Sequence, residues 1–351
     1  MSDFRPNYKN LEAAARNREV KRTPLYEHIV AVSVMEAITG ARFGGLYNGG
    51  AADLREYFRH YFGFFKDFGY DAAPFEICIG SVLPGGGALG NQRMDPAVKT
   101  KADFDRYPWD EIPKMYFDAS ARYFEALAAA APEGMKAVGG VGNGVFEIVQ
   151  DLTGYERLCY IRGDDPELYA ALFGKVGEVM KSIWKEFLPR FGRAFCVVRF
   201  GDDLGFRSST LLPPDDLREH VFPVYKDVAA LAHSFGKPFL LHSCGCIGGV
   251  FDDIIAAGID AKHSNEDAIM PFTEWVSRYG GRIGNFGGID TDALCRLDRP
   301  QMKEYITEIL DKCKGRGGIA FGCGNSIPDY VPPENYLNMI EIVREYRNDA
   351  N

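Results

Sequence analysis

Apolar runs rich in branched side chains alternate along this chain with longer stretches whose apolar residues recur at the helical period. The runs predict strands at residues 23–30, 73–79, 137–141, 195–200, 238–242, 259–263, 282–286 and 318–321. The stretches between them predict helices at residues 53–68, 116–130, 166–187, 215–235, 251–257, 271–279 and 301–314. Such alternation is typical of an α/β protein with a parallel sheet. Eight units predict a (β/α)8 TIM barrel, which typically takes about 250 residues plus insertions.

The chain has 351 residues, and its extra length lies early. We predict a long loop insertion at residues 80–113, after the second strand. Its glycine-rich start, residues 80–90, has neither the G-x-G-x-x-G nor the Walker spacing, so we interpret it as a lid or packing loop. No internal repeat or linker interrupts the pattern, and we predict a single domain over residues 1–351.

Polar side chains gather where the predicted strands end, and in barrels of this kind the chemistry collects at the C-terminal strand ends. The set is Glu27, His28, Glu76, Cys78, Asn143, Glu147, Asp202, Asp203, His242, Cys244, His263, Asn265, Glu266, Asp267, Asp290, Cys323 and Asn325. It is rich in acids, histidine and cysteine, and no Ser-His-Asp arrangement is evident in it. For Asp202 or Asp290 taken singly, a structural hydrogen bond is as good an explanation as a functional role.

Three of these residues predict a metal site. His242 and Cys244 lie one residue apart at the end of an apolar run, and Cys323 follows a second, glycine-flanked run. One imidazole and two thiolates are ligands that suit zinc. Three protein ligands leave one coordination position open, as catalytic zinc requires. Cys246 is expected to point away after the Gly245 turn, and the remaining cysteines read as small core residues.

Composition and charge narrow the range of partners. The chain is 46% hydrophobic and 25% charged, as in soluble globular proteins. Its net charge of −9 argues against a nucleic-acid partner, because a protein needs a basic face to bind the phosphate backbone. The first residues contain no secretory signal, and no apolar run reaches the roughly 18 residues of a membrane span. Eight cysteines are too few for a disulfide scaffold in a chain of this length. We therefore expect a cytoplasmic protein with no membrane partner.

Several motifs resemble the uroporphyrinogen decarboxylase superfamily. They are residues 201–205 (GDDLG), 242–245 (HSCG), 287–291 (GGIDT), 322–328 (GCGNSIP) and 332–335 (PPEN). Within the superfamily they are most similar to the zinc-dependent, corrinoid-linked methyltransferases. The resemblance extends from Arg22 to Arg347 and implies the same barrel that the alternation predicts.

Two departures separate this chain from the decarboxylase branch. The decarboxylases bind a tetrapyrrole without metal, using an arginine-rich segment after the first strand, whereas residues 26–32 (YEHIVAV) contain no arginine. The decarboxylases also tend to carry histidine in the last strand-end motif, where this chain has Cys323. The methyltransferase branch uses His-x-Cys and a distant cysteine as zinc ligands, which implies His242, Cys244 and Cys323 here.

The resemblance implies a methyltransferase with two cofactors, Zn²⁺ and a corrinoid supplied by a partner corrinoid protein. It would move a methyl group between a small methylated substrate, such as an ether, amine or thiol, and the cobalt of the corrinoid. Zinc would activate either the leaving heteroatom or an acceptor thiol. Residues 211–214 and 263–267 resemble O-demethylase components more than methylcobamide:coenzyme M methyltransferases.

Further roles follow for the remaining strand-end residues. Glu266 is a candidate for an additional ligand or proton carrier, and His263 is the second candidate. Asp202 and Asp290 are candidates for orienting His242 or the substrate. The candidates for substrate binding are Glu76, Glu147 and Asn325.

Three other functions remain open. A metal-free decarboxylase or lyase on the same barrel would contain no zinc and would bind a porphyrinogen. A tetrapyrrole-binding or corrinoid-chaperone protein would use the thiols structurally, although structural zinc usually has four protein ligands. A zinc hydrolase would need a general base, which Glu266 could supply. The oligomeric state is also open, a homodimer included.

Overall fold

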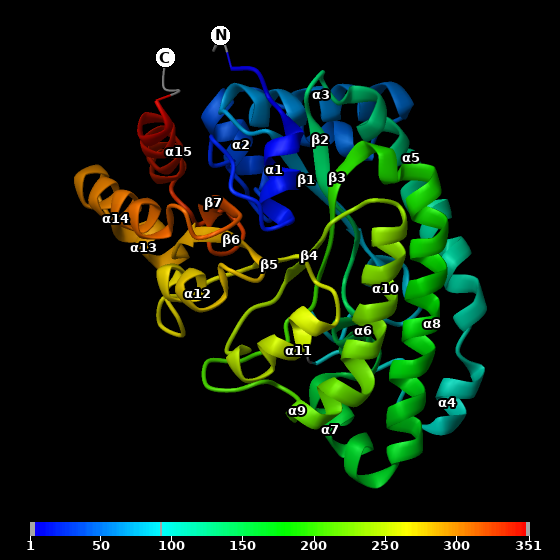
Figure 1. Cartoon of the computed structure of the whole chain (residues 1–351). Coiled ribbons are helices and arrows are strands. Elements are labelled where there is room, and N and C mark those ends of the chain that lie inside the picture. Colours follow the sequence, from blue (N-terminus) through cyan, green and yellow to red (C-terminus); the bar gives the residue numbers. More distant parts are fainter. Residues whose placement is uncertain (1–3, 92, 349–351) are drawn as a thin grey trace.

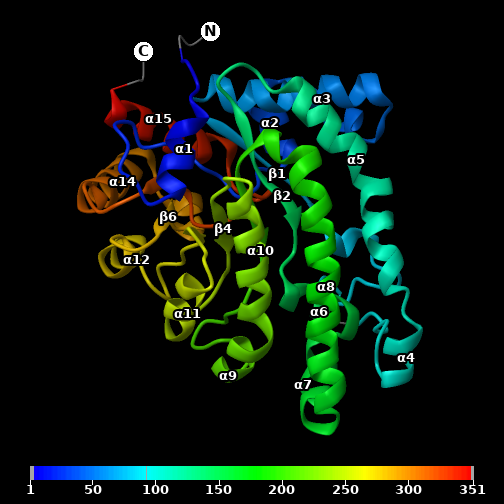
Figure 2. The same cartoon turned by 45° about the vertical axis from the view of Figure 1, so that its right-hand side comes forward.

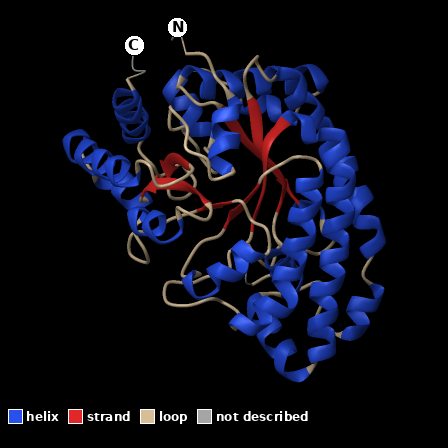
Figure 3. Cartoon of the chain, viewed as in Figure 1, coloured by secondary structure: helices blue, strands red, loops and turns tan. Residues whose placement is uncertain are grey.

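The computed structural model describes residues 4–91 and 93–348, and a curled, parallel sheet lies at its centre (Figures 1 and 3). Its seven strands are hydrogen-bonded in sequence order. They are β1 (Ala72–Cys78), β2 (Lys136–Gly142), β3 (Phe195–Gly201), β4 (Phe239–His242), β5 (Ala261–His263), β6 (Gly284–Ile289) and β7 (Ile319–Cys323). Seven of the eight predicted strands are therefore present, each close to its predicted bounds.

The first predicted strand, residues 23–30, is an extended segment rather than a strand. It makes two isolated parallel bridges, from Leu25 to Phe321 and from Val30 to Ile327. A side chain on Gly322 would place its Cβ only 1.8 Å from the Tyr26 carbonyl oxygen, so glycine permits this close approach. The described residues thus form a half-barrel of seven strands with this segment beside β7, a TIM-barrel-like arrangement in place of the predicted eight-stranded barrel.

Helices surround the sheet, over its outer face and at the ends of its strands. They are α1 (Tyr8–Ala15), α2 (Val32–Thr39), α3 (Ala51–Asp67), α4 (Lys101–Arg106), α5 (Ile112–Ala130), α6 (Val145–Thr153), α7 (Tyr155–Asp164), α8 (Pro166–Phe191), α9 (Pro214–Asp216), α10 (Phe222–Ser234), α11 (Phe251–Ala256), α12 (Phe272–Tyr279), α13 (Thr291–Arg296), α14 (Arg299–Cys313) and α15 (Pro333–Arg347). Helices α3, α5, α8 and α10 follow one another around β1 to β4 (Figure 2). Within the described ranges, no helix combines the length and apolar composition that a membrane crossing requires.

The predicted insertion contains short helical turns and the helix α4, and its glycine-rich part is tied to α6. The backbone N–H of Ala88 donates to the Asp151 carbonyl oxygen, and that of Leu89 donates to the Asp151 carboxylate, both at 3.2 Å. A Cβ on Gly86 would lie 2.7 Å from the same carboxylate. This part of the chain is therefore held close against Asp151 by backbone groups.

Two apolar layers line the two faces of the sheet, and together they fix the direction of each strand-end side chain. Val197, Leu240, Ala261 and Ala320 belong to an inner cluster, to which Leu11, Ala14 and Ala15 of α1 contribute from the N-terminal ends of the strands. Phe321 belongs instead to the larger cluster under the outer helices. Because side chains alternate along a strand, His242 and His263 share the inner face, whereas Cys323 shares the face of Phe321.

Candidate metal centre

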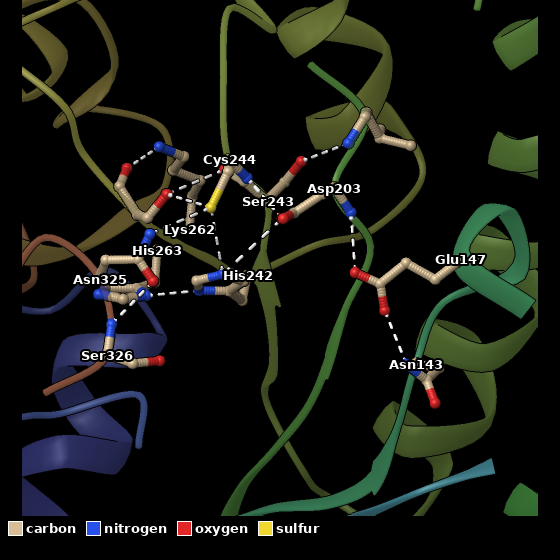
Figure 4. Close-up of polar contacts among 12 residues, drawn as sticks. Asn143, Glu147, Asp203, His242, Ser243, Cys244, Lys262, His263, Asn325 and Ser326 are labelled. Carbon is tan, nitrogen blue, oxygen red and sulfur yellow. Dashed lines mark hydrogen bonds and ion pairs between the residues drawn. The ribbon is translucent and has the colours of Figure 1, made fainter. Parts of the chain in front are cut away.

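His242 lies at the centre of the polar cluster at the C-terminal strand ends (Figure 4). It pairs in register with Gly201 of β3 and with His263 of β5. Its Nδ1 lies 2.8 Å from His263 Nδ1, and its Nε2 lies 3.4 Å from Cys244 Sγ. The Nε2 atom is also 3.8 Å from a carboxylate oxygen of Asp203. Each ring nitrogen of His242 therefore faces a different neighbour.

The donor atoms around His242 Nε2 fit a metal ion. Asp203, His242 and Cys244 form a group whose ligand atoms all lie within 4.8 Å of one another. Zinc binds nitrogen at about 2.0 Å and thiolate sulfur at about 2.3 Å with tetrahedral angles, which places two such ligands roughly 3.5 Å apart. The observed separation of 3.4 Å between His242 Nε2 and Cys244 Sγ matches this value. The Asp203 carboxylate also accepts the Cys244 backbone N–H at 2.8 Å, which fixes this turn.

Burial determines the protonation of these ligands. Burial lowers the pKa of His242 well below its usual value, so the imidazole is neutral and can act as a ligand. Burial and the nearby Asp203 raise the pKa of the Cys244 thiol to about 12. Without a metal, the thiol keeps its proton at neutral pH. Metal binding must therefore displace this proton, as thiolate ligation requires.

Cys323 lies beside this cluster, but its thiol contacts Thr291 and Ser326 instead of His242 or Cys244. Its Sγ is 3.2 Å from Thr291 Oγ1 and 3.9 Å from the Ser326 carbonyl oxygen. Two groups of three possible ligand residues occur in the described part of the chain, Asp203 with His242 and Cys244, and His28 with His242 and His263, and Cys323 belongs to neither. This follows from the alternation on β7, which turns Cys323 toward the outer face. The backbone of Cys323 still reaches the site, because its carbonyl oxygen is 2.9 Å from His263 Nε2.

His28 joins the cluster from the extended segment beside β7, although the strand-end pattern assigned it no role. Its ring stacks on that of His242 with centroids 3.7 Å apart and planes inclined by 11°. Its Nδ1 is buried without a hydrogen-bond partner. The residue was visible in the sequence as the polar end of an apolar run. The stacking depends on the pairing of that run with β7, which the sequence does not reveal.

Asp202 and Asp290 have structural partners. The buried Asp202 carboxylate accepts the backbone N–H groups of Phe146 and Glu147 at the start of α6, and the Tyr225 hydroxyl at 2.8 Å. Asp290 caps α13 by accepting the N–H groups of Asp292 and Ala293. Neither carboxylate has a hydrogen bond with His242 among these contacts, so both act here as helix caps.

Glu147 approaches the centre from α6, and it is a substrate-binding candidate from the sequence. Its carboxylate accepts the Asn143 side-chain N–H at 2.8 Å and the Asp203 backbone N–H at 3.2 Å. A Cβ on Gly201 would lie 3.8 Å from Glu147 Oε1 and 3.7 Å from His242 Cδ2, so the two side chains flank the same glycine. Burial, with Asp202 and Asp203 nearby, raises the pKa of Glu147 well above its usual value.

Glu76, another predicted substrate ligand, is engaged in an ion pair. Arg199 Nη2 lies 2.8 Å from Glu76 Oε2, and the Arg199 side chain is fully buried. Arg199 also donates to the Tyr26 hydroxyl at 2.6 Å and to the His28 carbonyl oxygen at 3.0 Å. Arg199 thus holds the segment that carries His28, and Glu76 is the ion-pair partner of Arg199.

A cavity of about 870 Å³ opens beside Cys244, one of the candidate ligands. Cys244, Glu266 and Asn325 all line it. Asn325 Nδ2 lies 3.5 Å from Cys244 Sγ, so this predicted substrate ligand contacts a predicted metal ligand. Glu266 is exposed on the cavity wall. The cavity gives a small molecule access to the Cys244 thiol.

Lys262, which the sequence analysis did not single out, also lines this cavity. Its side chain is buried, its Nζ lies 4.3 Å from the centroid of the Trp275 ring, and it donates a hydrogen bond to the Ser264 carbonyl oxygen. Burial lowers the pKa of Lys262 from 10.5 to about 7. A lysine inside the predicted strand at residues 259–263 was the available signal in the sequence.

The lowered pKa of Lys262 predicts that the stability of the folded protein depends on pH. Between about pH 7 and pH 10.5 the unfolded chain binds a proton at Lys262 that the folded protein does not hold, so stability rises with pH. Relative to Lys262→Met, the wild-type free energy of unfolding should gain up to about 1.4 kcal/mol per pH unit in this window. Denaturant unfolding at several pH values measures it. Lys185→Met removes an exposed lysine as a control, and equal slopes for the wild type and Lys262→Met would contradict the prediction.

Comparison with known proteins agrees with this architecture. A methyltransferase from Methanosarcina mazei superposes with a TM-score of 0.70 at 16% sequence identity, covering 97% of this chain and 99% of that chain. A uroporphyrinogen decarboxylase from Sorangium cellulosum is 25% identical over 189 residues, which is 54% of this chain and 51% of that protein. The chain thus matches about half the length of that curated relative. The profile of the uroporphyrinogen decarboxylase (URO-D) family matches residues 7–346. The chain therefore belongs to the URO-D family.

Proposed function

We propose that this protein is a zinc-dependent methyltransferase that moves a methyl group between a small methylated ether, amine or thiol and the cobalt of a corrinoid protein. The observation that carries this proposal is the convergence of His242 Nε2 and Cys244 Sγ, 3.4 Å apart, beside a cavity of about 870 Å³. Membership of a family of enzymes and the likeness in fold to a methyltransferase support it.

His242, Cys244 and Cys323 are the proposed zinc ligands. Cys323 enters through the family resemblance, whereas the separation of donor atoms favours Asp203 as the third ligand. Bound zinc would act as a Lewis acid on the heteroatom that carries the methyl group or on an acceptor thiol. Asn325 and Ser264 are placed to donate hydrogen bonds to the Cys244 sulfur, at 3.5 and 3.6 Å. These contacts stabilise negative charge on the sulfur once its proton has left.

The cavity wall suits a small substrate better than a tetrapyrrole with many carboxylates. Three basic residues line it. Of these, Arg296 is paired with Asp292 and Lys262 donates to the Ser264 carbonyl oxygen. The buried Arg199 is paired with Glu76. Only Arg207 of the cavity lining lacks such a pairing among these contacts, so the metal-free decarboxylase alternative has less support.

The test is a methyl-transfer assay on the zinc-loaded protein with chemically reduced cobalamin as the methyl acceptor. Phenyl methyl ethers, methylamines and methyl thiols are supplied in turn, and formation of methylcobalamin is followed by its absorption spectrum. The proposal expects methylcobalamin from one substrate class, and expects Cys244→Ala to abolish it. Absence of product from every class, together with decarboxylation of a porphyrinogen by the metal-free protein, would overturn the proposal in favour of the decarboxylase.

A further inference from the structure

Three contacts connect β7 to the proposed metal position through two imidazole rings. The Cys323 carbonyl oxygen lies 2.9 Å from His263 Nε2. His263 Nδ1 lies 2.8 Å from His242 Nδ1. His242 Nε2 then faces Cys244 Sγ at 3.4 Å. Both histidines are buried, so the contacts are made without competition from bulk water.

The Cys323 carbonyl oxygen determines which ring nitrogens of His263 and His242 carry a proton. A carbonyl oxygen only accepts hydrogen bonds, so His263 must carry its proton on Nε2. A neutral imidazole has one N–H, which leaves a lone pair on His263 Nδ1. The short contact between the two Nδ1 atoms then requires His242 to carry its proton on Nδ1. His242 Nε2 is left with its lone pair, on the side of Cys244.

Both rings must be neutral in this arrangement, and their burial and the short contact between them favour the neutral forms. Near His263 lie Arg199 and Lys262, which oppose a further proton on that ring, whereas the Asp203 carboxylate lies 3.8 Å from His242 Nε2. Protonation of His263 on Nδ1 would place a second N–H opposite that of His242 at the 2.8 Å contact.

We propose that His263 is a positioning residue that sets the tautomer of His242, with the Cys323 carbonyl oxygen as the fixed end of the row. This rests on the proposed function, because the tautomer matters through the ligand atom that it exposes. Histidines that bind metals usually donate their second N–H to a carboxylate, carbonyl or water, and changes at such partners typically alter metal affinity by about 10- to 100-fold. Here the acceptor is a second imidazole.

The nearby His28 does not make this cluster a three-histidine metal site. Its ring is stacked on that of His242, with planes inclined by only 11°. The lone pairs of an imidazole lie in the plane of the ring, so two stacked rings direct theirs in nearly parallel planes. The Nδ1 atoms of His242 and His263 are already paired with each other. His28 instead holds the plane of the His242 ring by stacking.

The experiment reads the tautomers directly in metal-free, ¹⁵N-histidine-labelled protein, by NMR correlation of each ring nitrogen with the ring protons. The wild type should show His242 protonated on Nδ1 and His263 on Nε2. His263→Leu removes the acceptor and should shift His242 toward protonation on Nε2. His263→Asn, of similar size, restores an oxygen acceptor and should return His242 to protonation on Nδ1. Zinc affinity should fall by about 10- to 100-fold in His263→Leu and recover in part in His263→Asn.

The wild-type spectrum alone decides the matter if a variant fails to fold, because His242 protonated on Nε2 would overturn the inference. Equal spectra for His242 in His263→Leu and His263→Asn would overturn it as well. A protein that binds no zinc but has the expected tautomers would refute the proposed function and leave the tautomer assignment intact. The two failures are therefore distinguishable.

Discussion

Cys244→Ala is expected to lose zinc entirely in purified protein and to lose methyl transfer with it. Cys244 supplies the sulfur closest to His242 Nε2, at 3.4 Å, and its removal leaves a single strong ligand facing Asp203. The loss of affinity should exceed the roughly 100-fold that changes behind a ligand produce. Metal content by mass spectrometry after dialysis against a weak chelator measures it.

Cys246→Ala is the matched control, because Cys246 lies two residues further along the same turn and belongs to neither group of candidate ligands in the described chain. It should keep its full zinc content. Zinc retained by Cys244→Ala, or lost equally by both variants, would refute the assignment of this site.

The same measurement identifies the third ligand. If Cys323 ligates zinc, Cys323→Ala loses the metal and Asp203→Asn keeps it. If Asp203 is the third ligand, as the distances between donor atoms favour, Asp203→Asn loses the metal. The Asp203 carboxylate oxygen lies within 4.8 Å of the donor atoms of His242 and Cys244. Cys323→Ala then keeps the metal and loses the thiol contacts with Thr291 and the Ser326 carbonyl oxygen. The two results exclude each other.

Arg199→Met should destabilise the fold by about 3–5 kcal/mol, because it leaves the Glu76 carboxylate inside the half-barrel without its partner. The Arg199 side chain is fully buried and that of Glu76 is 9% exposed. The substitution also removes the hydrogen bonds to the Tyr26 hydroxyl and the His28 carbonyl oxygen. The free energy of unfolding in guanidinium chloride measures the effect.

An exposed arginine provides the comparison for this prediction. Arg282 pairs with Asp252 at the surface, with side chains 50% and 76% exposed, so Arg282→Met should cost less than about 1 kcal/mol. Combining Arg199→Met with Glu76→Gln should recover part of the lost stability, since the unpaired charge is then removed. If Arg199→Met lowers the free energy of unfolding no more than Arg282→Met does, the buried pair does not stabilise the half-barrel.

The distribution of apolar residues predicted most of the strands but not the form of the first one. Residues 73–79 and 195–200, for example, are observed as β1 (Ala72–Cys78) and β3 (Phe195–Gly201). Residues 23–30 have a similar composition but form only two isolated bridges beside β7. Strand formation depends on continuous pairing with neighbours, and such pairing is a property of the folded chain rather than of the segment itself.

The candidate site likewise contains residues that the sequence pointed to and residues that only the folded chain brings together. His242 and Cys244 were recognisable because two ligands one residue apart at a strand end are brought together by local geometry alone. The direction of the Cys323 thiol depends on which face of β7 meets the outer helices, where Phe321 is buried. Asp203, the stacked His28 and the pair of Arg199 with Glu76 lie at the same place only after distant segments have paired.

By itself, the sequence determined the succession of strands and helices, the end of the sheet where polar side chains gather, and the closeness of His242 and Cys244 in the chain. These depend on periodicity and on short spacings, which the chain encodes locally. Only the tertiary structure decided which side chains surround His242 Nε2 and which nitrogen of His242 is left free. Those properties arise from strand register and from hydrogen bonds between residues far apart in the chain, such as the bond between His263 and the Cys323 carbonyl oxygen.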